Sequence, residues 1–305
     1  MRHPGGQSSG SRARPNLGRS RLPLAAVALA LFAAGLFFGI QLAKPPPRPD
    51  FGPAEPRTPL PVAEPGVTPA AEEEPTPGRQ PAPGGDQARI AIVVDDLGRS
   101  LQDLDRLTGL GVPLTYAVLP FETLTPEVVA RLRQRGEEFI CHLPMQAKGG
   151  ADPGPGALLG AMSRTQLVEA TRRALDAVPG AVGVNNHMGS LIASRPDAMA
   201  AVISVVADHR LYFLDSRTSA DTVGYELARK AGLAAGERQV FLDTDRDPER
   251  IRGQFEQLLA LAEERGGVIA IAHPYPETLA ILEVQIPRAL ARGFRFVPAS
   301  ALLDG

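Results

Sequence analysis

The chain has 305 residues, of which 44% are apolar, and a formal net charge of −2, values typical of a globular protein with one or two domains. This charge argues against a general nucleic-acid binder, which would carry a basic surplus. The single cysteine, Cys141, excludes an internal disulfide framework and a zinc finger. Because the chain has no tryptophan and only 5% aromatic residues, any sugar site should be a short cleft rather than an extended stacking surface.

The N-terminal region contains a predicted membrane anchor. Residues 1–21 form a polar tail with five arginines, and residues 22–43 follow without an acidic or basic side chain. As a helix, this stretch would span about 30 Å, the thickness of a bilayer core. A cleaved signal peptide is the alternative, although its apolar core usually has only about 7–15 residues. Because the arginines come first, we expect a single-pass protein of the inner (cytoplasmic) membrane, with a cytoplasmic N-terminus and a periplasmic or otherwise extracytoplasmic C-terminal domain.

A predicted linker follows the anchor. Residues 44–87 contain 14 of the 30 prolines and a run of three glutamates at 72–74. Such a segment has too little apolar content to form a core and too much proline to form a helix or a sheet. We therefore expect a disordered, extended tether that acts as a spacer.

Residues 88–305 alternate between apolar runs and amphipathic stretches. The apolar runs predict strands at 90–94, 114–119, 138–141, 181–184, 211–214, 239–242, 268–272 and 295–297. Helices are predicted between them, including Thr125–Arg135, Pro196–Asp208 and 251–264, the last after a cap at Asp247 and a proline at 248. This alternation predicts a parallel α/β barrel. No glycine-rich phosphate loop follows the first strand, so nothing indicates a nucleotide site.

Two adjacent carboxylates, Asp95 and Asp96, follow the first predicted strand. Parallel α/β folds carry their chemistry at this end of their strands. Because successive residues of a strand face opposite ways, we expect the two carboxylates to point to opposite sides of the chain. One could then bind a metal ion while the other accepts a proton. Taken alone, the pair is equally well interpreted as a solvated turn or a helix cap.

Three of the four histidines of this domain, His142, His187 and His273, also follow predicted strands. In a parallel barrel these strand ends meet at one rim. One aspartate with two histidines is typical of a hydrolytic zinc site, where a further carboxylate could accept a proton from water and a further histidine could protonate a leaving amine. The fourth, His209, lies at the end of the helix predicted over Pro196–Asp208, where its charge suits the helix dipole, and we assign it a structural role.

Five stretches of the domain are similar to motifs of a known family. They are residues 93–98 (VVDDLG), 142–145 (HLPM), 183–190 (GVNNHMGS), 213–216 (FLDS) and 272–278 (AHPYPET). Through them the domain resembles the divergent polysaccharide deacetylases, relatives of the chitin and peptidoglycan N-deacetylases. The resemblance implies a distorted (β/α)7 barrel over residues 88–305, and a periplasmic or envelope location if the host is Gram-negative.

The resemblance also implies roles for individual residues. Asp95 matches the catalytic base and His273 the general acid, whereas Asp96 and His142 match ligands of a divalent metal ion, which we expect to be zinc. The chain departs from the family pattern at Gln146, which stands where true deacetylases have a second histidine.

A second departure concerns the third metal ligand. The Arg-x-Pro-Tyr motif of true deacetylases has no counterpart here, and its place in the order is taken by Asn185, Asn186 and His187. We infer that His187 supplies the third ligand from the neighbouring strand.

Four further polar residues at strand ends have less definite roles. Asn186 and Asp215 could orient a ligand or contact substrate, and for Asp215 an equal alternative is that it caps the turn before residues 217–219. Asp243 and Asp245 are interpreted as loop and cap residues, because Asp247 and a proline open a helix directly after them.

These assignments predict a membrane-anchored, metal-dependent hydrolase that removes N-acetyl groups from an envelope glycan such as peptidoglycan. The alternative is a degenerate domain that binds glycan without catalysis, as an envelope scaffold or regulator, and the two departures from the family pattern favour it. A phosphoesterase would need a basic cluster at the rim, where Arg99 is the only nearby candidate. The predicted partners are the glycan and the membrane, and not nucleic acid.

Overall fold

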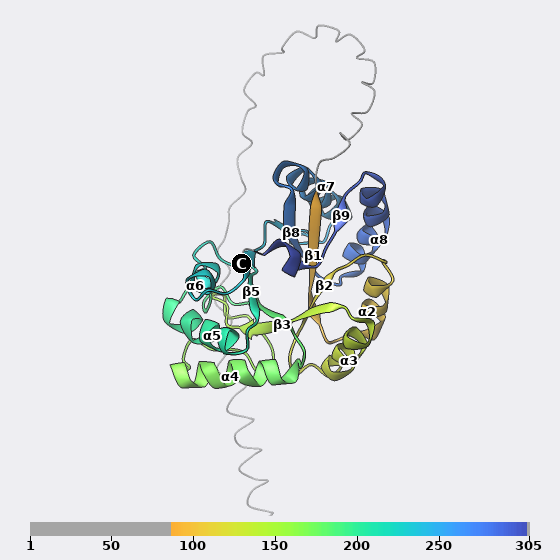
Figure 1. The fold of residues 1–305 in the computed structure, drawn as a ribbon. Helices are drawn as coiled ribbons and strands as arrows, with labels where there is room; N and C mark the ends of the chain where they lie inside the picture. Colours follow the sequence, from red (N-terminus) through yellow and green to blue (C-terminus); the bar gives the residue numbers. More distant parts are fainter. Residues whose placement is uncertain (1–86, 304–305) are drawn as a thin grey trace, which may run out of the picture. The chain divides into compact units, whose positions relative to one another are not determined.

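The computed structural model describes residues 87–303, which form a curled sheet of nine parallel strands with helices outside it (Figure 1). The order along the sheet is β6-β5-β4-β3-β2-β1-β8-β7, and β9 also pairs with β1. The strands are β1 (Arg89–Leu97), β2 (Thr115–Val118), β3 (Glu138–Met145), β4 (Gly183–Met188), β5 (Tyr212–Asp215), β6 (Ala235–Glu237), β7 (Val240–Phe241), β8 (Gly267–Ala272) and β9 (Arg295–Phe296). The helices are α2 (Leu101–Thr108), α3 (Thr125–Arg135), α4 (Arg164–Ala177), α5 (Pro196–Asp208), α6 (Gly224–Lys230), α7 (Pro248–Arg265), α8 (Pro276–Ala291) and the 3-10 helix η1 (Ala299–Leu302).

The sheet is packed on both faces, which explains why its strands are apolar without interruption. In β1, Ile90 and Ile92 belong to the larger core, between the sheet and the helices. Ala91 and Val93 belong to a smaller core inside the curl, together with Ile271 of β8. This division follows from the two-residue period of a strand.

The two ends of the sheet are joined by the chain itself rather than by strand pairing. Only Arg238 and Gln239 separate β6 from β7, yet these strands lie at opposite ends of the sheet. The backbone amide of Arg238 donates to the carbonyl oxygen of Asp215 in β5 (3.1 Å), and that of Gln239 donates to the carbonyl oxygen of Ile269 in β8 (2.9 Å). The chain therefore crosses the opening in one peptide step, and we call Arg238 and Gln239 the sheet junction.

The parallel α/β architecture is confirmed, and two helices, Thr125–Arg135 and Pro196–Asp208, have the predicted bounds. Helix α7 begins at Pro248 after a cap at Asp247, as predicted. The predicted barrel is found as a curled parallel sheet, but not as a closed barrel of seven strands. The sheet has nine strands, and β6 does not pair with β7 in residues 87–303. Strand β6 escaped prediction because its Ala-Gly-Glu sequence has no β-branched or aromatic residue.

The predicted membrane anchor lies outside the described part of the chain. Among residues 87–303, no helix is both long enough and apolar enough to cross a membrane. The tail at 1–21, the anchor at 22–43 and all of the linker at 44–87 except its last residue fall outside the described residues, so these assignments stay predictions.

Candidate metal centre

A row of polar side chains continues the inner face of the sheet at the carboxyl ends of its strands. On four strands, an inward apolar residue is followed two positions later by a polar one, as the strand period requires. The pairs are Val93 and Asp95 on β1, Ile140 and His142 on β3, Leu214 and Ser216 at the end of β5, and Ile271 and His273 at the end of β8. The fold therefore carries these polar groups to the same end of the curled sheet.

Asp95 and Asp96 do not point to opposite sides, as strand alternation led us to expect. The pairing of β1 with β2 shifts register between Val94 and Leu97, and Asp96 has a left-handed φ of 61°. Such a bulge inserts one extra residue and re-aims a side chain. As a result, both carboxylates approach His142 Nε2, with Asp95 Oδ2 at 3.6 Å and Asp96 Oδ1 at 3.3 Å.

Asp96, His142 and His187 each direct one potential ligand atom to a common point. His187 Nδ1 lies 2.9 Å from Asp96 Oδ1 and 3.1 Å from His142 Nε2. Strands β3 and β4 place the two histidines on one face, since His142 is paired with Asn185 and Pro144 with His187. The structure thus brings the three predicted ligands together, and their role in metal binding stays a prediction.

This donor set fits a zinc ion. The ligand atoms of a tetrahedral zinc site lie about 2.0–2.1 Å from the ion and therefore about 3.3 Å from one another. The three separations found here are 2.9, 3.1 and 3.3 Å. In addition, Asp96 Oδ1 is buried and has no hydrogen-bond partner, although both imidazole nitrogens are close. A buried oxygen without a donor is costly, and a cation would satisfy it.

Asn185 orients two members of the site and was missed as a site residue from the sequence. Its Oδ1 lies 2.8 Å from His142 Nδ1, and its Nδ2 donates to Asp95 Oδ1 (2.8 Å) and to Ser216 Oγ (3.3 Å). Because a carboxylate only accepts, the amide nitrogen must face Asp95 and the amide oxygen must face His142. His142 then carries a proton on Nδ1 and presents Nε2 to a metal. The available signal was the alternation that places residues 185 and 187 on one strand face.

His273 is held by Asp243, which lies in the loop after β7 as predicted but also bonds to the imidazole. Asp243 is 3% exposed, and its Oδ1 lies 2.9 Å from His273 Nδ1. Its Oδ2 accepts from the His273 backbone amide (2.6 Å) and from Thr278 Oγ1 (2.8 Å). The signal for this role was its place two residues after Phe241, which packs against the inner core.

The base and acid candidates both have raised pKa values. Burial raises the pKa of Asp95, and the positive charges of nearby histidines offset this only in part. Burial disfavours the charged form of His273, but the hydrogen bond to Asp243 and the charge of Asp95 raise the pKa of His273 to about 9. Although partial burial of Asp96 disfavours its charged form, its two imidazole neighbours hold its pKa well below the usual range. At neutral pH, His273 is therefore protonated and Asp96 is ionised.

Asn186 and Asp215 connect the strand ends to the loops that follow them. Asn186 Oδ1 accepts from the backbone amide of Ser216 (2.9 Å), and its Nδ2 donates to the Met188 carbonyl oxygen (2.9 Å). The Asp215 carboxylate accepts from three donors within residues 217–225, at 2.7, 2.8 and 3.1 Å. For Asp215, these contacts are those of the turn-capping alternative.

Asp245 and His209 occupy the structural positions that the sequence predicted. Asp245 Oδ1 accepts from the backbone amide of Asp247, immediately before α7. His209 is the C-cap residue of α5 and is exposed. Neither residue is part of the candidate site.

Gln146, at the position of the missing histidine, holds a loop instead of facing the ligand cluster. Its Oε1 accepts from the backbone amide of Gly160 (2.7 Å), and its carbonyl oxygen accepts from the backbone amides of Leu191 and Ile192. The residue thus connects the β3–α4 loop to the segment after β4.

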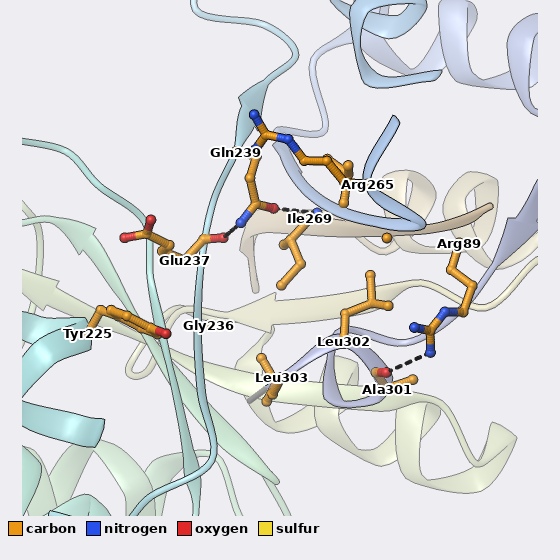
Figure 2. Close-up of a pocket in the computed structure, with 12 residues that line it drawn as sticks. Arg89, Tyr225, Gly236, Glu237, Gln239, Arg265, Ile269, Ala301, Leu302 and Leu303 are labelled. Carbon is orange, nitrogen blue, oxygen red and sulfur yellow. Dashed lines mark hydrogen bonds between the residues drawn. The ribbon is translucent and has the colours of Figure 1, made fainter. Parts of the chain in front are cut away.

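Two cavities lie at opposite ends of the strands. One of about 190 Å³ adjoins Asp96 and is bounded by Arg99, Ser100 and Tyr275. A larger one, of about 430 Å³, lies at the amino ends of β1 and β8, between Arg89 and the sheet junction (Figure 2). None of the predicted site residues lines the larger cavity. The smaller cavity, at the carboxyl ends, is lined by one of them, Asp96.

Comparison with known proteins agrees with the resemblance seen in the motifs. The family profile described as divergent polysaccharide deacetylase matches residues 92–303. The chain belongs to this family. Among family relatives, the YibQ protein of Escherichia coli (strain K12) is 34% identical over 216 residues, covering 71% of this chain and 67% of its own. A Haemophilus influenzae protein is 30% identical over 219 residues, covering 72% and 75% of the two chains.

The fold also occurs in a solved structure. The crystal structure of protein ATU2773 from Agrobacterium tumefaciens C58 aligns with a TM-score of 0.67 at 25% identity. The alignment covers 73% of this chain and 92% of that protein. The family and its fold are thus established for the described domain.

Proposed function

We propose that this protein is a metal-dependent hydrolase that removes N-acetyl groups from a glycan of the cell envelope. The observation that carries the proposal is the pair formed by Asp95 and His273. A buried carboxylate with a raised pKa and a protonated histidine stand beside one candidate metal centre, and the charge of His273 acts on Asp95. Membership of the deacetylase family supports a glycan substrate.

Asp96, His142 and His187 would hold the divalent ion, for which we propose zinc. When bound at such a site, zinc lowers the pKa of a coordinated water and polarises an acyl carbonyl oxygen. Asp95 accepts the water's proton at Oδ2, because its Oδ1 is engaged by Asn185. Its raised pKa makes it a stronger base than an ordinary aspartate.

His273 supplies a proton to the leaving amine of the sugar. Its Nδ1 is engaged by Asp243, so the proton that it donates is the one on Nε2. A pKa of about 9 keeps the ring protonated at neutral pH. A well-placed general acid contributes roughly 10²–10⁴-fold to a rate.

For the location, we propose a single-pass inner-membrane protein with its C-terminal domain in the periplasm. The apolar stretch at residues 22–43, the arginines before it and the need to reach an envelope glycan support this placement. Protease treatment of spheroplasts should digest the C-terminal domain. Protection of the domain in intact spheroplasts would overturn the proposed orientation.

The test combines metal binding with acetate release in the purified full-length chain. Titration of the chelator-treated protein should give one zinc per chain, with at least tenfold weaker binding for His142→Ala and no change for the control His209→Ala. Wild type should release acetate from N-acetylated peptidoglycan fragments. Asp95→Asn should keep its zinc and lose at least 100-fold in this activity.

The possible failures have different meanings. If wild type binds no metal, the hydrolase proposal falls. If it binds zinc and glycan fragments but releases no acetate from them, the non-catalytic glycan-binding scaffold takes its place. Equal acetate release by wild type and Asp95→Asn would remove Asp95 as the base.

A further inference from the structure

The sheet junction lies next to both halves of the candidate site. On the side of β5, the backbone amide of Arg238 is bonded to Asp215. On the side of β8, Gln239 closes the opening with its side chain as well as its backbone, because its Oε1 accepts from the Ile269 amide (2.7 Å) and its Nε2 donates to Glu237 (Figure 2). Gln239 thus closes the opening on the side of the amino ends of the strands. On the side of the carboxyl ends, the junction residue at the opening is Arg238.

The side chain of Arg238 reaches the base side of the site. Its Nε donates to the Ser216 carbonyl oxygen (2.8 Å) and its Nη2 to the Arg217 carbonyl oxygen (2.9 Å). The hydroxyl of Ser216 accepts from Asn185, which in turn donates to Asp95. Two hydrogen-bonded steps therefore connect the guanidinium to the residue that orients the base.

The same guanidinium reaches the acid side. Its Cζ lies 4.8 Å from the ring centroid of Phe241, a cation–π distance. The Phe241 ring lies 5.3 Å from that of His273, and Tyr275 stacks on His273 at the same distance. His273 thus contacts two aromatic rings, and the guanidinium of Arg238 lies over one of them.

The guanidinium is not committed to an ion pair. Among residues 87–303, no carboxylate lies within salt-bridge distance of Arg238, and its hydrogen bonds go to two backbone carbonyls. Burying half of an arginine side chain without a carboxylate partner costs desolvation free energy, which holding a surface loop would not by itself require. Its planar fork does, however, allow two directed hydrogen bonds and one stacked face at the same time.

We propose that Arg238 is a positioning residue that sets the placement of Asp95 relative to His273 across the sheet junction. The catalytic meaning of this placement rests on the proposed function, whereas the placement itself does not. Arg238 acts through Ser216 on one side and through Phe241 on the other, and it does not contact the three candidate metal ligands.

The test uses the full-length chain with ¹⁵N-labelled histidine, free of metal, at neutral pH. Arg238→Met removes the guanidinium and keeps the length of the side chain, whereas Arg238→Lys keeps the charge and loses the fork. The matched control is Arg292→Met at the end of α8. The Cζ of Arg292 lies 5.2 Å from the centroid of the Phe294 ring, a similar cation–π contact far from the junction in the sequence. The ring signals of His142 and His273 report the two halves of the site.

In Arg238→Met, the ring signals of both histidines should move, while His209 and the control variant stay unchanged. In the zinc-loaded chain, kcat for acetate release should fall at least tenfold with KM and zinc affinity within twofold, and Arg238→Lys should recover only part of the loss. Ring signals identical to wild type in Arg238→Met would overturn the proposal, as would shifted signals with unchanged kcat. If wild type releases no acetate, the ring signals still decide the placement, so the two failures are distinguishable.

Discussion

At the scale of single residues, the three histidines of the candidate site differ in tautomer or charge because their surroundings differ. Asn185 fixes the ring of His142 so that Nε2 faces the ligand cluster. Burial lowers the pKa of His187 and favours the neutral form that a metal ligand needs. Asp243 keeps His273 protonated. The surroundings of these identical side chains thus suit two of them to the proposed ligand role and one to the proposed acid role.

The pKa of His273 gives a testable pH dependence. Because its folded pKa of about 9 exceeds an unfolded value of about 6.5, the ring stabilises the fold below pH 6.5, and this contribution is lost as pH rises through 9. A shift of this size corresponds to roughly 3 kcal/mol. In metal-free protein, urea unfolding between pH 6 and pH 10 should show this loss in wild type and a much smaller one in Asp243→Asn. Parallel curves for the two proteins would contradict the assignment.

Asn185 should control metal affinity without being a ligand. Asn185→Leu removes the acceptor that fixes the His142 tautomer, and loss of such a partner typically weakens metal binding by about 10–100-fold. Zinc titration measures the effect. Ser216→Ala, which removes only the second contact of the amide, serves as the control and should change affinity by less than threefold. Equal zinc affinity in Asn185→Leu and wild type would refute this role.

At the scale of elements, the sequence predicts the strands well and their ends poorly. The apolar runs are local signals, so β1, β3 and β4 were found, but the last two extend to Met145 and Met188. These extensions are polar or contain proline, and they remain strands only because their neighbours pair with them. The bulge that turns Asp96 inward likewise depends on the register between two strands, which no local pattern reveals.

Gln146 shows that a residue at a lost motif position can take a structural role within an element. Because its side chain is hydrogen-bonded to the β3–α4 loop, Gln146→His should not add a zinc ligand. Zinc affinity should stay within threefold of wild type, and the lost hydrogen bond should cost about 1–3 kcal/mol in urea unfolding. Gln146→Met, which loses the same bond without gaining an imidazole, should be destabilised to a similar extent. A tenfold rise in zinc affinity for Gln146→His would show that the position is open to the site.

At the scale of the whole molecule, the way in which the chain joins the two ends of the curled sheet could not be predicted from the sequence. The junction depends on the amides of Arg238 and Gln239 bonding to strands that are distant from each other in the chain. The contact of Asp243 with His273 was missed for a related reason, since His273 follows another strand, β8, and the aspartates around Asp243 are typical of a loop. What the sequence did establish was the family, the parallel architecture and the polar residues at the strand ends.

Zinc should stabilise the whole fold if the three ligands act together. At a free zinc concentration of 100 times Kd, linkage gives about 2.7 kcal/mol, which for a domain of this size raises Tm by roughly 5–10 °C. Thermal unfolding with and without chelator measures this shift. His187→Ala should abolish most of it, whereas His209→Ala should leave it intact. A wild-type Tm that does not respond to zinc would exclude binding at this centre.

The strand order also fixes a sequence of events in time. Strands β1 to β4 are neighbours in the sheet and follow one another along the chain, and all three candidate ligands lie on them. A chain that emerges N-terminus first therefore has its complete ligand set by residue 187, well before β8 and His273 have been made. The candidate ligand set is therefore complete in a growing chain while the candidate acid is still absent.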